Sequence, residues 1–127
     1  MERSHIEQAK FWLEGGQHIA RSTSEKREKW SVAVAMLVHA IIKANDALVY
    51  KFINMTPRRH DDARKLFEDL KRKSLIKPEH TLFDQVIQEA INNKAKAEYR
   101  IAFFSKSDYE NLERKTVKFI RMAEEYL

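Results

Sequence analysis

The stretch from Val32 to Ile42 reads VAVAMLVHAII and holds ten apolar residues, with His39 as the only exception. A helix that is apolar on nearly all sides must be surrounded by other helices. Its apolar part is shorter than the roughly 20 residues that a bilayer-spanning helix needs, so we expect no membrane contact. The chain is therefore predicted to form a helical bundle around this segment.

The size and composition of the chain narrow the prediction further. Its 127 residues suffice for one domain, covering 1–127, and its two glycines and two prolines favour long helices with few breaks. The absence of cysteine excludes disulfides, thiolate catalysis and cysteine-type zinc sites. A net charge of +5 permits an acidic partner without requiring one. The polar start of the chain shows no signal-peptide pattern, so we expect a cytoplasmic protein.

Helix signals along the chain predict about five helices. Ser4 and Glu7 form a capping box that begins the first, and Gly15-Gly16 interrupts or loosens it. The predicted spans of the other helices are about 24–53, 59–73, from 77 onward and from 107 onward, the last with its own capping box. Segment 99–104 fits either a fraying helix end or an apolar loop. Short connections favour an all-α antiparallel bundle with a long central second helix.

Two faces of that central helix are apolar when each residue advances the helix by 100°. One face is bulky, and the other is a strip of small side chains that lets a neighbouring helix approach closely. These residues are Leu37, Ile41, Leu48 and Phe52 on the bulky face, and Ala33, Ala40, Ala44 and Ala47 on the strip.

The third face is polar and carries His39, Lys43, Asp46 and Tyr50 at i, i+4, i+7 and i+11. These groups suit acid–base chemistry or phosphate binding. They equally suit a solvated stripe, or a hydrogen-bonded seam against another helix or subunit. Asn45 lies nearer the apolar side, where an unpaired amide costs about 1–3 kcal/mol. We therefore expect Asn45 to be buried and hydrogen-bonded.

The third helix opens with the cluster Arg58-Arg59-His60, followed by two aspartates. Arginines can hold phosphate oxygens in a two-pronged fork, although the neighbouring carboxylates weaken that interpretation. Adjacent helical positions diverge by 100°, so His60 and the aspartates are not expected to bind a metal.

The last helix carries Arg114, Lys118 and Arg121 on one face. Such a face is usually solvated, and an RNA surface is the alternative. The chain has no glycine-rich phosphate loop, no His-Glu-x-x-His motif and no serine or threonine in a nucleophile context. We therefore predict no catalytic residue, no metal and no cofactor.

The central segment Leu37–Val49, LVHAIIKANDALV, resembles the long second helix of the HEPN family, a helical domain named from higher eukaryotes and prokaryotes nucleotide-binding. Pro57–Ala63 resembles the histidine-containing head of that family's third helix. Tyr99-Arg100 and the acidic helix after Asp108 resemble its closing segment. The resemblance covers about residues 30–127.

The resemblance implies a bundle that commonly dimerises, is often encoded with a nucleotidyltransferase and in many members is an RNase toxin. Those RNases carry an arginine and a histidine with four to six residues between them. None of the histidines here has an arginine five to seven positions before it, so the chain resembles the non-nucleolytic branch. The residues then implied in ligand binding are His39, Lys43, Asp46, Tyr50, Arg58, Arg59, His60 and Arg100.

Our leading hypothesis is a dimeric HEPN-like module that binds a nucleotide or RNA, or pairs with a nucleotidyltransferase in a toxin–antitoxin-like system. Four bulky aromatic residues exceed the needs of one small core and favour a homodimer: Trp12, Trp30, Phe103 and Phe104. One alternative is a structural interaction scaffold without a ligand. The other is a ribonuclease using non-standard residues such as His39, Asp46 or His60.

Overall fold

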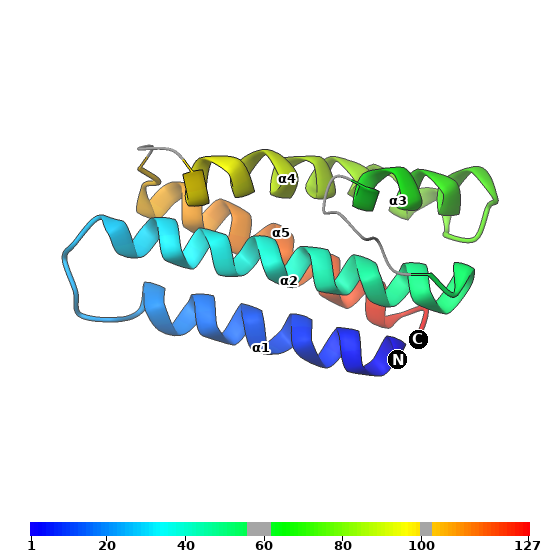
Figure 1. The fold of residues 1–127 in the computed structure, drawn as a ribbon, viewed down its shortest axis with the longest axis horizontal. Coiled ribbons are helices and arrows are strands. Elements are labelled where there is room, and N and C mark those ends of the chain that lie inside the picture. The colour runs from blue at the N-terminus through cyan, green and yellow to red at the C-terminus, as the bar shows by residue number, and fades with distance from the viewer. Residues whose placement is uncertain (56–61, 100–102) are drawn as a thin grey trace.

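The computed structural model describes residues 1–55, 62–99 and 103–127. Within these ranges it contains five α-helices, one short 3₁₀ helix and no strand, which confirms the predicted all-α bundle. The long helices run side by side, with α2 between α1 and α4 and both chain termini at one end (Figure 1). The elements are α1 (Glu2–Ala20), α2 (Glu28–Ile53), α3 (Asp62–Arg72), η1 (Pro78–Phe83), α4 (Asp84–Tyr99) and α5 (Lys106–Glu124).

Helix α2 is the core of the bundle and contacts α1, α3, α4 and α5. All four alanines of its small strip, and three of the four bulky residues opposite, are completely buried. Helix α2 is long and apolar enough to cross a membrane when only length and composition are considered. By these two properties, the prediction that its apolar part is too short for a membrane span is wrong. Because 72% of its most apolar window is buried inside the bundle, packing against the other helices accounts for that composition.

The two glycines of α1 do not interrupt it, since the helix is continuous from Glu2 to Ala20. They mark a close approach to α2. A Cβ on Gly16 would lie 3.2 Å from the carbonyl oxygen of Ala33, and one on Gly15 would lie 3.0 Å from a Met36 side-chain carbon. The glycines therefore serve packing between α1 and α2.

The predicted cap at Ser4 is wrong, because α1 already begins at Glu2 and no side chain caps its first turn. Ser4 is instead exposed inside the helix, where its hydroxyl accepts a hydrogen bond from Gln8 at 3.4 Å. Helix α2 begins at Glu28, later than the predicted residue 24.

Helix α2 ends at Ile53 as predicted, and the structure supplies a reason closer to the helix than Thr56-Pro57, which lie outside the described residues. Asn54 takes up the left-handed conformation with φ of 60°, and its N–H donates to the Tyr50 carbonyl at 3.0 Å. A left-handed residue after the last turn is a common way to end a helix, and asparagine tolerates it better than most residues.

The cap of helix α5 lies two residues before the predicted cap at Ser107. Ser105, not Ser107, is the capping residue: its hydroxyl accepts from the Asp108 N–H at 3.0 Å, and its own N–H donates to the Asp108 carboxylate at 2.8 Å. Just before this cap, Phe103 is 43% exposed and Phe104 packs against the core. The sequence left open whether segment 99–104 is a helix end or a loop. Tyr99 belongs to α4, and residues 100–102 lie outside the described ranges.

Candidate functional site

The polar face of α2 lies largely against α1 and forms a seam between the two helices. The His39 ring stacks on Trp12 of α1, with ring centroids 4.6 Å apart and planes at 24°. Farther along, the Tyr50 ring lies 6.2 Å from the ring of His5. The sequence allowed a solvated stripe or a seam against another helix as structural roles for this face. The contacts with α1 favour the seam. We call the group of His5, Lys43, Asp46 and Tyr50 the seam cluster.

The centre of the seam cluster is the pair Lys43 and Asp46. The ammonium nitrogen lies 4.0 Å from one carboxylate oxygen, Oδ2, and the two side chains are 32% and 10% exposed. The other oxygen, Oδ1, is buried and has no hydrogen-bond partner. Burial raises the pKa of Asp46 from 3.8 to about 6, and the charge of Lys43 only partly opposes this. The carboxyl group is thus close to half protonated in mildly acidic solution.

His5 belongs to the same cluster and was missed by the sequence analysis. Both of its ring nitrogens are buried without a hydrogen-bond partner. Burial lowers the pKa of His5, and the charges of Lys43 and the chain N-terminus lower it further. His5 precedes Ile6 directly and Ala9 by one helical turn, and both are buried. That spacing places all three residues on one face of the helix and would have revealed the histidine.

Asn45 is fully buried and paired, as predicted. Its side-chain nitrogen donates to the carbonyl oxygen of Ala63 at 3.0 Å, which ties the first turn of α3 to the middle of α2. Its side-chain oxygen has no partner. Asn45 therefore positions α3 on the side of α2 that faces away from the seam with α1.

Of the eight predicted ligand-binding residues, the structure places Lys43, Asp46 and Tyr50 in the seam cluster, and His39 lies farther along the same face against Trp12. The other four, Arg58, Arg59, His60 and Arg100, lie outside the described residues. In the part of the chain that the structure describes, no group of three or more histidine, aspartate or glutamate side chains is placed to hold a metal ion.

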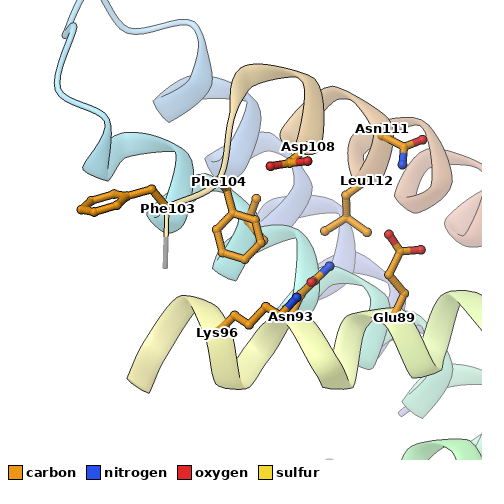
Figure 2. A pocket seen from close by; sticks show the side chains of 9 residues that line it. Glu89, Asn93, Lys96, Phe103, Phe104, Asp108, Asn111 and Leu112 are labelled. Carbon is orange, nitrogen blue, oxygen red and sulfur yellow. The ribbon is translucent and has the colours of Figure 1, made fainter. Parts of the chain in front are cut away.

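A separate pocket of about 270 Å³ lies between α4 and the start of α5. The Phe104 ring fills the space between the two helices, whereas Phe103 points away (Figure 2) and lies 3.7 Å below the guanidinium carbon of Arg27. The two carboxylates that line the pocket already have partners: Glu89 pairs with Lys115 at 2.7 Å, and Asp108 caps α5. The other polar side chains that line the pocket are Asn93, Lys96 and Asn111.

No family model matches this chain, and no curated protein matches its sequence. The resemblance to the HEPN family therefore remains a prediction from the sequence motifs alone.

Proposed function

We propose that this chain is a small HEPN-like binding module that binds a nucleotide or RNA at the seam cluster. The observation that carries the proposal is the set of buried, unpaired polar atoms in a tightly packed seam: Asp46 Oδ1 and both ring nitrogens of His5. Each such atom costs about 1–3 kcal/mol. Asn45 carries the same cost at its side-chain oxygen while its amide holds α3, whereas the unpaired atoms of Asp46 and His5 lie together beside Lys43, where a ligand would gain specificity from them.

The chemistry of the cluster suits a nucleotide. Asp46 can accept hydrogen bonds from the amino groups of a base, and His5 can donate or accept according to its tautomer. Lys43 is the most exposed of the three and supplies a cation for a phosphate.

An exposed apolar surface on α1 and α2 supports the proposed homodimer. Phe11 is 69% exposed and Val32 is 50% exposed, and a shallow hollow of about 300 Å³ adjoins Phe11 between Gln8 and Met36. The four aromatic residues named in the sequence support a homodimer less than their number suggested. Three of them pack against the core of the monomer: Trp12, Trp30 and Phe104. Pairing with a nucleotidyltransferase would use the same apolar surface.

The proposal is tested by thermal unfolding with a panel of nucleotides and short RNA oligonucleotides. A ligand at 100 times its dissociation constant stabilises the folded state by about 2.7 kcal/mol, and we expect such a shift in wild type. Lys43→Gln should abolish it, and Lys51→Gln, an exposed lysine at the end of the same helix, should not. No shift with any nucleotide or RNA would contradict the proposal. Cleavage of the RNA would instead favour the ribonuclease alternative.

A further inference from the structure

Two adjoining hollows lie on the surface where α1 meets α5, away from the pocket of Figure 2. They measure about 330 and 310 Å³, and both are lined by Arg21 and Glu113. Because they share these two residues, they form one continuous depression, which we call the α1–α5 groove. The seam cluster is not part of its lining.

One half of the groove is strongly basic. Its lining includes Arg21 from the end of α1 and Arg114, Lys118 and Arg121 from α5, against the single carboxylate of Glu113. That carboxylate accepts a hydrogen bond from the Tyr109 hydroxyl at 3.0 Å. In the described part of the chain, none of the four cations forms an ion pair, and all four are exposed. The groove thus keeps an excess of positive charge in contact with solvent.

The cations of α5 are set out in a row. Positions 114, 118 and 121 share a helix face, and at a rise of 1.5 Å per residue they span about 10 Å along the axis. A single phosphate would be met by cations gathered around one point. A row of cations instead matches a ligand whose negative charges repeat along a line.

The other half of the groove contains Trp30 and Tyr109, and because Tyr109 is only 3% exposed, Trp30 is the ring that a ligand can reach. The Trp30 ring lies 5.7 Å from that of Tyr109, and the Lys29 ammonium lies 4.6 Å from the Trp30 ring. Glu110 and Glu113 also line this half, together with Arg21 and Lys106, so its formal charges balance and it lacks the positive excess of the basic half. Aromatic rings accept any base by stacking, and carboxylates accept hydrogen bonds from base amino groups.

We infer that the α1–α5 groove binds single-stranded RNA, with the backbone along Arg114, Lys118 and Arg121 and a base against Trp30. This inference rests on the proposed function and adds a second contact surface for its RNA ligand. A positively charged track beside an aromatic platform is the general way in which proteins hold single strands. An acidic protein segment fits less well, because the basic half offers little apolar surface apart from Val117.

The test is fluorescence anisotropy with a labelled single-stranded RNA dodecamer at several salt concentrations. The groove variant Arg114→Gln/Lys118→Gln/Arg121→Gln should bind at least about tenfold more weakly, and its log–log salt slope should be shallower by about 2, at 0.7 per lost contact. The matched control is Lys51→Gln/Lys65→Gln/Lys73→Gln, which removes the same charge from exposed positions elsewhere. It should stay within about twofold of wild type.

Tryptophan fluorescence tests the aromatic half. RNA should quench wild type and Trp12→Phe, and quenching should be lost in Trp30→Phe. Wild-type affinity of the groove variant would overturn the inference while leaving the proposed function standing. Stabilisation by nucleotides without any RNA binding would likewise overturn the inference and leave the proposed function standing. If neither nucleotides nor RNA bind, the inference and the proposed function are both refuted. Equal competition by polyglutamate would show a surface for acidic proteins and would also overturn it.

Discussion

Asp46 and Asp84 are almost equally buried, at 7% and 8% exposure, yet their environments differ in kind. Asp84 begins α4, where its carboxylate lies 3.2 Å from the Lys71 ammonium and 3.6 Å from the Arg64 guanidinium. Burial raises the pKa of Asp84, but hydrogen bonds with Glu68 and Lys71 and the charges of Lys71 and Arg64 bring it below the ordinary value. Asp46 has one distant lysine, and its pKa is raised.

The comparison shows that burial alone does not fix the state of an acidic side chain in this bundle. At the junction of α3 and α4, two cations compensate for the loss of water around one carboxylate. At the seam of α1 and α2, one lysine at 4.0 Å does not. The first arrangement is what a structural ion-pair cluster needs. The second leaves an energetic deficit at the place where we propose that a ligand binds, so the two aspartates should respond to mutation with opposite sign.

The largest expected effect is a gain in stability from Asp46→Asn. A pKa raised from 3.8 to about 6 means that the ionised carboxylate disfavours folding by up to about 3 kcal/mol at neutral pH. We expect the variant to be about 2 kcal/mol more stable, since the new amide is also incompletely paired. Urea unfolding at pH 7.5 measures this. The same variant should lose nucleotide binding, so lower stability together with intact binding would show that Asp46 is an ordinary structural residue.

The gain in stability from Asp46→Asn should depend on pH. A carboxyl group with a raised folded pKa favours folding fully below its unfolded value, and this contribution is lost as the pH rises through about 6. The stability difference between Asp46→Asn and wild type should therefore be close to zero near pH 4. It should reach its full value of about 2 kcal/mol above pH 6. Urea midpoints at pH 4.5, 5.5 and 7.5 provide the measurement.

His5 acts in the opposite direction within the same pH range. Its folded pKa is lowered, so protonation opposes folding and stability is lost as the pH falls through 6.5. His5 is present in both proteins. Its contribution therefore cancels when the free energy of unfolding of Asp46→Asn is subtracted from that of wild type at each pH. A difference that does not change with pH would contradict the assignment of the titration to Asp46.

Asp84→Asn should destabilise the protein by about 1–2 kcal/mol at pH 7.5. Removing the carboxylate leaves Lys71 and Arg64 with Glu68 as their main acidic neighbour. The loss stays below the 3–5 kcal/mol typical of a fully buried pair because both cations are partly exposed. Glu110→Gln, at an exposed position on α5, is the control and should change stability by less than about 0.5 kcal/mol. A neutral effect of Asp84→Asn would remove the contrast between the two aspartates.

Much of the fold follows from the sequence because α2 and the inner faces of its neighbours repeat apolar residues at helical spacing. The error at the start of α5 has a plain cause: Ser105 with Asp108 and Ser107 with Glu110 are two overlapping capping boxes of equal spacing. Propensity alone cannot choose between them. The Gly15-Gly16 pair was misjudged for a similar reason, since only the position of α2 shows that the glycines permit close packing.

The candidate sites were less predictable than the fold. The α2 stripe could be drawn on a helical wheel, but its burial by Trp12 and His5 depends on how α1 crosses α2. The α1–α5 groove needs Arg21 and the cations of α5 to meet in space, although they come from opposite ends of the chain. A pattern within one helix reveals a face, whereas the partner of that face is a property of the tertiary structure.

The smallest expected effect comes from Asn45→Leu, one residue from Asp46 on the same helix. Leucine has nearly the same shape as asparagine, but it cannot donate to the Ala63 carbonyl, and α3 would lose its tie to α2. It also removes the unpaired side-chain oxygen, which offsets part of the loss. We expect a net destabilisation of about 1 kcal/mol, measured by urea unfolding at pH 7.5. Its independence of pH between 4.5 and 7.5 separates it from the effect at Asp46, because asparagine does not titrate. A gain in stability from Asn45→Leu would mean that the unpaired oxygen outweighs the hydrogen bond, and Asn45 would then carry a deficit like the one that we assign to the seam cluster.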